Sequence, residues 1–312
     1  ELQHEKKLRL LNDYKLFSLF YEPSSRTYFS FREAMRRLGG DWDGVLNAQS
    51  ETSVAKGESL ADAIRTFELM ADVLIVRHPL DGALRAAQQY ASKPLINGGD
   101  GAHEHPTQTL VDLYTIAKEK GSIKGQVVAL FGDLLHGRTV HSLAYALARF
   151  GAKIRTISLP GLGLPTYVQA RLNELKCDWA EVLSTNETFD ERSPLIYNVE
   201  SVINGSRGKL SGNQVGTVMG LLQECTALYV TRLQSERVDD PGQASGDVQV
   251  LTTSLLESVP DTAIILHPLP RRSEIAYEID ADKRAAYFRQ VANSIPVRMA
   301  ILALMLGVKG ST

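Results

Sequence analysis

The sequence predicts an α/β protein built from two doubly wound parallel-sheet domains. Short β-branched or aliphatic runs alternate with helical patterns over most of the 312 residues, and this alternation is typical of βαβ units. One hydrophobic core rarely grows beyond roughly 250 residues, so the length favours two domains. The stretch KEKGSIKG at 118–125, where a helical pattern ends in charge and glycine before a new apolar run, is the expected boundary.

A series of short apolar runs gives the predicted strands. They are Leu16–Phe20, Val45–Leu46 with its neighbours, Val73–Val76, Pro94–Ile96, Val127–Phe131, Ile154–Leu159, Leu228–Val230 and Ala263–Leu266. Between them, apolar residues recur at helical spacing, as at Leu60, Ile64, Phe67 and Met70 or at Leu143, Leu147 and Phe150. A Gly-, Ser- and Asn-rich stretch at 186–216 predicts a flexible surface insertion.

The composition argues against several classes of partner. The formal net charge of −2 provides no large basic field for nucleic acid, and no apolar run approaches the roughly 20 residues that span a bilayer. The two cysteines, Cys177 and Cys225, form neither a CxxC pair nor a disulfide framework. Residues Glu1 to Arg9 are charged and polar, unlike a signal peptide, so we expect a cytoplasmic protein.

Polar residues gather directly after the predicted strands. In open parallel sheets ligands bind at the carboxyl ends of the strands, so these residues are candidates for a site. In chain order they are Ser24-Ser25-Arg26-Thr27, Arg77-His78, His105 with Gln108, Asp133 with His136 and Arg138, Arg232 with Gln234, and His267-Pro268-Leu269-Pro270-Arg271. Several arginines, each able to bind a carboxylate or phosphate in a bidentate fork, indicate an anionic substrate with several such groups. For any single arginine, the alternative to binding a substrate is an ion pair that only stabilises the fold.

The first of these sets has the features of a phosphate site. Tyr28, Phe31, Met35 and Leu38 are spaced as one face of a helix that begins near Ser25. The hydroxyls and the guanidinium of the set then lie in the first turn, where backbone N–H groups and the helix dipole favour an anion. A serine that only caps the helix is the alternative interpretation.

Motifs for metals and nucleotide cofactors are missing. His103 and His105 lack the further ligands of a zinc site, so we expect no metal. Gly161-Leu162-Gly163 lacks the third glycine and the helix start of a dinucleotide fingerprint, and no GxxxxGK[ST] motif occurs. NAD and ATP roles are therefore disfavoured, and neither a GxSxG elbow nor a site-like cysteine suggests covalent catalysis. We expect no cofactor.

A set of motifs runs in order from about Leu16 to Gly307. They are SSRT at 24–27, KGESLAD at 56–62, VRHP at 76–79, NGGDGAHEHPTQTLVDLYTI at 97–116, GDLLHGRTVHSL at 132–143, TRLQSER at 231–237 and HPLPR at 267–271. Together they resemble the catalytic chains of the aspartate carbamoyltransferase family, and only the 186–216 insertion lies outside the resemblance. The related ornithine carbamoyltransferases typically carry an HCLP motif where this chain has HPLPR.

The resemblance implies the aspartate/ornithine carbamoyltransferase fold, with a cleft between two domains. A carbamoyl phosphate-binding domain would comprise 1–121 plus 284–312, and an aspartate-binding domain 122–283. The implied activity transfers the carbamoyl group of carbamoyl phosphate to L-aspartate, early in pyrimidine biosynthesis. The resemblance also implies a homotrimer with shared active sites, and possible regulatory subunits. An ornithine-specific enzyme and a catalytically silent homologue are the alternatives, although a cationic amine is a poor ligand for several arginines.

The resemblance also assigns roles to residues. Carbamoyl phosphate would be bound by Ser24, Ser25, Arg26, Thr27, Arg77, His105, Gln108, Pro268 and Leu269. Thr52, Ser53 and Lys56 would reach in from a neighbouring subunit, and aspartate would be bound by Lys56, Arg138, Arg232 and Gln234. Catalysis would depend on Arg26, Thr27, Lys56, Arg77, His105 and Gln108. The family's serine four residues before the lysine is Thr52 here, which leaves that role open between Thr52 and Ser53.

Overall fold

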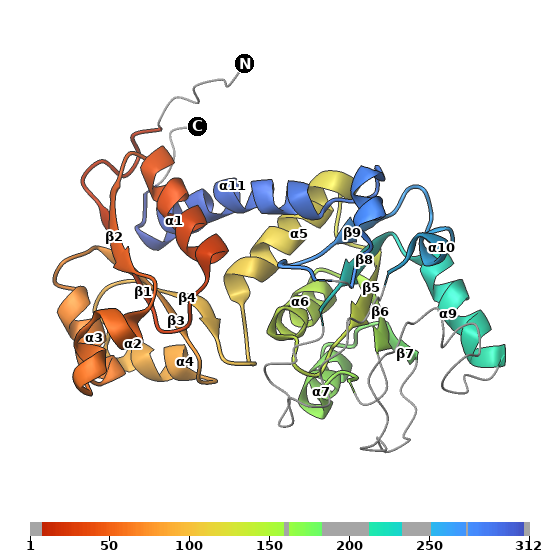
Figure 1. Cartoon of the computed structure of the whole chain (residues 1–312), viewed down its shortest axis with the longest axis horizontal. Helices are drawn as coiled ribbons and strands as arrows, with labels where there is room; N and C mark the ends of the chain where they lie inside the picture. The colour runs from red at the N-terminus through yellow and green to blue at the C-terminus, as the bar shows by residue number, and fades with distance from the viewer. Residues whose placement is uncertain (1–7, 159–161, 183–211, 233–250, 273, 309–312) are drawn as a thin grey trace. The chain divides into compact units, whose positions relative to one another are not determined.

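The computed structural model describes residues 8–158, 162–182, 212–232, 251–272 and 274–308, with only the backbone of 182 and of 212–217 (Figure 1). The chain divides into two units, which are described separately below. Unit 1 comprises Glu1–Val111 and Val291–Thr312, and unit 2 comprises Asp112–Gln290. No helix within the described ranges is both long enough and apolar enough to cross a bilayer.

Unit 1 contains a parallel sheet of four strands in the order β2-β1-β3-β4. The strands are β1 (Lys15–Phe20), β2 (Asp41–Val45), β3 (Val73–His78) and β4 (Leu95–Asp100). The connecting helices are α1 (Ser25–Arg37), α2 (Ala48–Glu51), η1 (Ser53–Lys56), α3 (Leu60–Phe67), α4 (Ala83–Ala87) and η2 (Gln88–Tyr90). The chain then continues into α5 (Pro106–Lys120), and the last helix is α11 (Tyr287–Met305).

Helices cover both faces of this first sheet. Leu16 and Phe20 of β1 pack with residues of α1 and α11 in one apolar cluster. Phe17 and Leu19 pack with residues of α3 and α4 in a second cluster. Successive side chains of a strand point to opposite faces, so this alternation buries β1 on both sides. The sheet is therefore doubly wound, as the sequence predicts.

Unit 2 contains a parallel sheet of five strands in the order β7-β6-β5-β8-β9. The strands are β5 (Val127–Gly132), β6 (Lys153–Ser158), β7 (Trp179–Val182), β8 (Ala227–Val230) and β9 (Ile264–Leu266). The helices are α6 (Arg138–Arg149), α7 (Thr166–Glu174), α9 (Gly212–Glu224), α10 (Thr253–Leu256) and η4 (Tyr277–Ala281). Val128 and Leu130 pack with α6 and α7, whereas Ala129 and Phe131 pack with α9 and α10.

The predicted strands all overlap strands of the structure, but β7 was missed and β2 begins earlier than expected. Helix α1 confirms the predicted start at Ser25, and its apolar stripe is buried. Two helical patterns end sooner than the sequence suggested, because Met70 and Phe150 lie beyond α3 and α6 and are exposed. Of the 186–216 insertion, the part before 212 lies outside the described residues, and the rest begins α9.

The bounds of the two units are not those predicted for the two domains, and the domain bounds stay a prediction. The sequence placed the domain bounds after residue 121 and before residue 284. In the structure the units divide after Val111, within α5, and before Val291, within α11.

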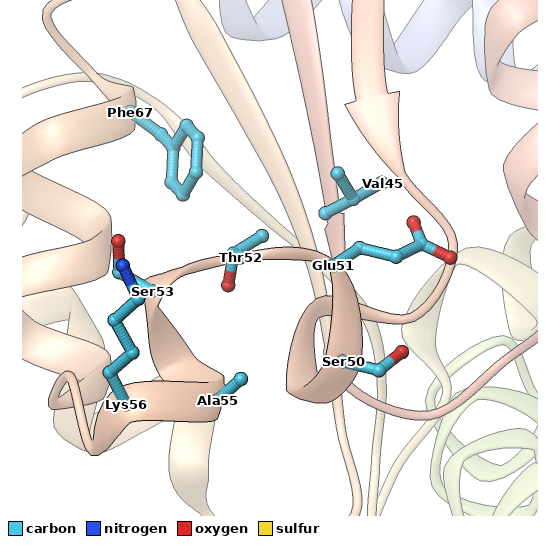
Figure 2. A pocket seen from close by; sticks show the side chains of 8 residues that line it. All are labelled: Val45, Ser50, Glu51, Thr52, Ser53, Ala55, Lys56 and Phe67. Atoms are coloured by element: carbon cyan, nitrogen blue, oxygen red, sulfur yellow. The ribbon is translucent and has the colours of Figure 1, made fainter.

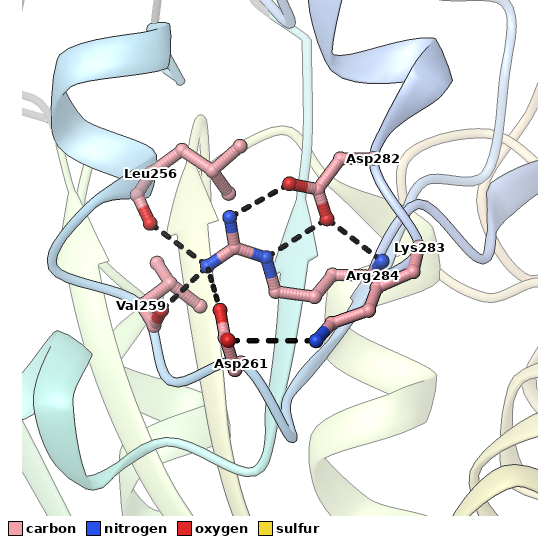
Figure 3. A network of polar contacts seen from close by, with 6 residues as sticks. All are labelled: Leu256, Val259, Asp261, Asp282, Lys283 and Arg284. Carbon is pink, nitrogen blue, oxygen red and sulfur yellow. Dashed lines mark hydrogen bonds and ion pairs between the residues drawn. The ribbon is translucent and has the colours of Figure 1, made fainter.

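Arg284 forms a buried polar network that fastens α10 to the segment before α11 (Figure 3). Its Nη1 donates to the carbonyl oxygens of Leu256 at 3.0 Å and Val259 at 2.6 Å, at the end of α10. Its Nε and Nη2 donate to the two carboxylate oxygens of Asp282 at 2.9 and 2.8 Å. The hydrogen bonds from Arg284 lower the pKa of Asp282 to about 2. A cation that satisfies the last carbonyls of a helix stabilises that end.

Asp282→Asn should lower the free energy of unfolding by about 1–2 kcal/mol at pH 7, because it removes the charge partner of a buried guanidinium. The folded-state pKa of about 2 lies below the ordinary value of 3.8. The stabilisation is therefore complete above pH 4 and declines as the pH falls toward 2. Urea unfolding monitored by tryptophan fluorescence from pH 7 to pH 3 measures both effects.

Asp261→Asn is the matched control. Asp261 also contacts Arg284, at 3.8 Å, but its side chain is 79% exposed, so its removal should cost less than about 0.5 kcal/mol. A loss for Asp282→Asn that equals the control's, or that does not change with pH, would contradict this assignment.

Candidate active site

The strands of unit 1 end along one edge of its sheet, and site candidates follow each of them. The register pairs Leu19 with Val45, Phe20 with Arg77, and His78 with Asp100. All these strand pairs are parallel, so the segments after β1, β2, β3 and β4 leave the sheet on the same side. The structure therefore brings the expected carbamoyl phosphate residues of unit 1 to one edge.

Ser24 to Thr27 form the N-cap and first turn of α1. Ser24 is the N-cap residue, but its side chain makes no capping hydrogen bond; its hydroxyl instead donates to Thr27 Oγ1 at 3.3 Å. Thr27 is buried, whereas Ser25 and Arg26 are exposed. This geometry disfavours the alternative of a serine that only caps the helix. It places hydroxyls and an exposed cation at the positive end of the helix dipole, where an anion binds well.

Arg77 is buried near the end of β3, where it contacts β4 and the segment that follows β1. Its Nη1 donates to the Gly98 carbonyl oxygen at 3.1 Å, and its Nη2 lies 3.2 Å from Glu22 Oε2. Glu22 follows β1, so the ion pair joins the ends of two adjacent strands. A buried guanidinium held in this way keeps its orientation and its charge.

His105 and Gln108 lie at the start of α5, in the segment that follows β4. His105 is buried, and its Nδ1 lies 3.4 Å from the hydroxyl oxygen of Thr107. Gln108 is half-buried, and its backbone N–H donates to the His105 carbonyl oxygen at 3.0 Å. The imidazole and the amide thus come from one helical turn after the strand adjacent to β3.

Thr52, Ser53 and Lys56 lie in the α2–η1 segment after β2, where they line a pocket of about 520 Å³ (Figure 2). The pocket is lined by Val45, Ser50, Glu51, Thr52, Ser53, Ala55, Lys56 and Phe67. The Thr52 hydroxyl makes hydrogen bonds within its own segment. It donates to the Ala48 carbonyl oxygen at 2.7 Å and accepts from the Val54 N–H at 3.2 Å. Ser53 and Lys56 are exposed, so Ser53 is the more available hydroxyl of the two candidates.

Unit 2 repeats the arrangement at the edge of its own sheet. The register pairs Phe131 of β5 with Val230 of β8, and Tyr229 of β8 with Leu266 of β9. Arg138 begins α6 after β5 and is buried, and Arg232 follows β8 and is half-buried. Pro268 and Leu269 follow β9. The two arginines and this turn therefore lie along the carboxyl edge of the second sheet.

A close approach of backbone at Gly132 sets the spacing of this edge. A Cβ atom at Gly132, whose φ is +121°, would lie 2.4 Å from the Thr231 carbonyl oxygen. The Thr231 N–H donates to the Phe131 carbonyl oxygen at 2.8 Å, and its hydroxyl donates to the Asp133 carbonyl oxygen at 3.2 Å. Only glycine fits here, and the segments that lead to Arg138 and Arg232 begin side by side.

Other candidates stay untested or were not anticipated. Gln234 lies outside the described residues. Across the described ranges, no group of three or more His, Cys, Asp or Glu side chains is placed to hold a metal ion. The motifs assign His267 no separate role and do not include Glu274 or Gln290, yet all three are buried around the Pro268–Leu269 turn. No local pattern in the sequence marks Glu274 or Gln290, because charged residues lie near both of them in the chain.

The chemistry of the two edges suits anionic ligands. Unit 1 places Arg26 and Arg77 with several hydroxyls along the carboxyl edge of its sheet, which suits a phosphate and a polar carbonyl group. Unit 2 collects Arg138 and Arg232, which suits carboxylates.

Comparisons with known proteins agree with this chemistry. Two family models match, "Aspartate/ornithine carbamoyltransferase, carbamoyl-P binding domain" at residues 1–118 and "Aspartate/ornithine carbamoyltransferase, Asp/Orn binding domain" at residues 208–305. The aspartate carbamoyltransferase catalytic subunit of Thermococcus gammatolerans is 42% identical over 311 residues, which cover 99% of this chain and 90% of the relative.

Solved structures of aspartate transcarbamoylases are also similar to this chain. The catalytic subunit of M. Jannaschii aspartate transcarbamoylase matches with a TM-score of 0.77 and 39% identity, covering 98% of this chain and 89% of that chain. The Trypanosoma cruzi aspartate transcarbamoylase in complex with carbamoyl phosphate and aspartate matches with a TM-score of 0.74 and 35% identity, covering 94% and 84%. The chain belongs to the aspartate/ornithine carbamoyltransferase family.

Proposed function

We propose that this protein is an aspartate carbamoyltransferase, which transfers the carbamoyl group of carbamoyl phosphate to the amine of L-aspartate. The products are N-carbamoyl-L-aspartate and phosphate, in an early step of pyrimidine biosynthesis. The observation that carries the proposal is the placement of cationic and hydroxyl side chains after strand ends in both sheets, in a chain of this family. Relatives at about 40% identity over nearly the whole chain carry the same activity in their names.

Carbamoyl phosphate binds at the carboxyl edge of the sheet of unit 1. Its phosphate binds the first turn of α1, at Ser24, Ser25, Arg26 and Thr27. Arg77, His105 and Thr27 donate hydrogen bonds to its carbonyl oxygen. Gln108 and the backbone carbonyls of Pro268 and Leu269 accept hydrogen bonds from its amide. The burial of Arg77, Thr27 and His105 supports their role, since donors fixed in a poorly hydrated site act strongly on a developing charge.

Aspartate is bound through its two carboxylates by Arg138, Arg232, Gln234 and Lys56. This choice separates aspartate from ornithine, because the cationic side chain of ornithine is repelled by the arginines of unit 2. A bidentate arginine fork matches a carboxylate in both shape and charge.

The reaction needs no covalent enzyme intermediate. The deprotonated amine of aspartate attacks the carbamoyl carbon, and a C–N bond forms while the carbonyl oxygen gains negative charge. Arg77, His105 and Thr27 stabilise that oxyanion. The carbon–oxygen bond to phosphate then breaks, and the leaving phosphate takes the amine proton. Orientation of both substrates provides the remaining rate enhancement.

Lys56, with Thr52 or Ser53, completes the active site of an adjacent subunit, so we propose a homotrimer with shared sites. The exposure of Ser53 and Lys56 at the two ends of η1 supports this role, because exposed side chains are accessible to another chain. Regulatory subunits and a cytoplasmic location stay predictions from the sequence. A silent homologue is disfavoured, since Arg26, Lys56, Arg77, His105 and Arg232 are all present.

A steady-state phosphate-release assay with aspartate and ornithine side by side tests the activity. Release should require both carbamoyl phosphate and aspartate, and ornithine should give none above spontaneous hydrolysis. Arg26→Ala should lower kcat/KM for carbamoyl phosphate by at least about 100-fold. Arg36→Ala is the control on the same helix, because Arg36 is exposed and paired with Glu33, and it should change kcat/KM less than about twofold. Release with ornithine and none with aspartate would refute the choice of substrate, and a folded protein inactive with both would favour the silent homologue.

Subunit mixing tests whether sites are shared. Lys56→Ala and Arg26→Ala chains should each be nearly inactive alone. Each mixed trimer should contain one site with both native residues, so activity should return to about one third of the wild-type value per trimer. Mixed trimers isolated with two affinity tags, and confirmed by native mass spectrometry, give the measurement. No recovery in such trimers would show that Lys56 acts within its own chain or not at all.

A further inference from the structure

The turn after β9 adopts a conformation that its sequence does not favour. Leu269 has a φ of +51°, in the left-handed region, which a bulky side chain rarely occupies. Such a conformation persists when the surrounding structure holds it, and it concentrates at sites where backbone geometry matters. Under the proposed function, this turn presents the carbonyl groups of Pro268 and Leu269 to carbamoyl phosphate.

His267 holds the turn from its first residue. Its side chain is fully buried, and its Nδ1 accepts the Leu269 N–H at 2.8 Å. Because an N–H donates to Nδ1, that nitrogen carries no proton, and the neutral ring carries its proton on Nε2. Burial lowers the pKa of His267, which favours this neutral form.

Glu274 fixes the other side of the imidazole. Its Oε1 lies 2.8 Å from His267 Nε2, and its Oε2 accepts the Arg272 N–H at 2.8 Å. Burial alone would raise the pKa of Glu274, but its interactions with His267 and with backbone N–H groups outweigh burial and lower it. An ionised carboxylate therefore faces the proton-bearing nitrogen and keeps the ring from turning over.

Gln290 fixes the backbone of the same residue. Its Oε1 accepts the His267 N–H at 2.9 Å, and its Nε2 donates to Asp112 Oδ1 at 2.6 Å. Gln290 and Asp112 are both buried. The first residue of the turn is thus held through its main chain by Gln290 and through its ring by Glu274.

We propose that His267, held by Glu274 and Gln290, is a positioning residue that sets the backbone carbonyls of Pro268 and Leu269 for the amide of carbamoyl phosphate. The inference rests on the proposed function and adds a specific source of selectivity. Inorganic phosphate has no amide and does not need these carbonyls. His267 therefore governs how strongly carbamoyl phosphate is preferred over phosphate, and not how strongly phosphate binds.

Two substitutions at His267 separate this role from general stability. His267→Leu removes the acceptor for the Leu269 N–H, and the dissociation constant of carbamoyl phosphate should rise at least about tenfold while that of inorganic phosphate changes less than about twofold. His267→Asn should recover most of the loss, because an asparagine oxygen can accept the N–H two residues ahead. Calorimetric titration of the wild-type protein and both variants with each ligand measures these constants.

Gln290→Met covers the case in which His267→Leu fails to fold. It removes the acceptor of the His267 N–H and the donor to Asp112 while it keeps the side-chain length, and it should weaken the binding of carbamoyl phosphate by about threefold and leave the binding of phosphate unaffected. Equal weakening of both ligands in the variants, or unchanged carbamoyl phosphate binding, would overturn the inference while leaving the proposed function intact. A wild-type protein that binds phosphate without preferring carbamoyl phosphate would overturn both.

Discussion

The parallel pairing of strands is the constraint on which the rest of this structure depends. A parallel register aligns the carboxyl ends of neighbouring strands, so residues separated by tens of positions in the chain leave the sheet at the same edge. The pairing of Phe20 with Arg77 places the start of α1 beside a buried arginine. The pairing of Phe131 with Val230 aligns the ends of β5 and β8, so the segments that lead to Arg138 and Arg232 leave the second sheet at the same edge. Each unit thus gathers charged groups without needing them close in sequence.

Buried charged and polar side chains need hydrogen-bond or ion-pair partners, and in this protein those partners also determine how the side chains are oriented. The buried Arg77 is held by Glu22 and by the Gly98 carbonyl group. The buried His267 is held by contacts on both ring nitrogens. Removing one partner of such a set leaves a desolvated polar group, which costs more than the bond itself contributed. The same contacts that stabilise the fold therefore fix donors and acceptors for a reaction in which misplacement is costly.

Local patterns predicted much of this fold, and they failed where structure depends on distant residues. Central strands such as β3 and β5 are continuous apolar runs, which a sequence displays directly. The missed strand β7 and the misplaced β2 lie at the edges of their sheets, where less apolar surface is buried and the pattern is weaker. The first turn of α1 was predictable because helix periodicity and N-terminal chemistry are both local. The contacts of Gln290 with His267 and Asp112 join residues 23 and 178 positions apart, and no local pattern specifies them.

In the proposed function, the phosphate of carbamoyl phosphate binds the first turn of α1 and the carboxylates of aspartate bind the arginines of unit 2. A crystal structure with an analogue that joins a phosphonate to aspartate tests it directly. The phosphonate should lie at Ser24 to Thr27, and the two carboxylates should lie within hydrogen-bond distance of Arg138 and Arg232. A phosphonate bound away from α1, or carboxylates that contact neither arginine, would contradict it.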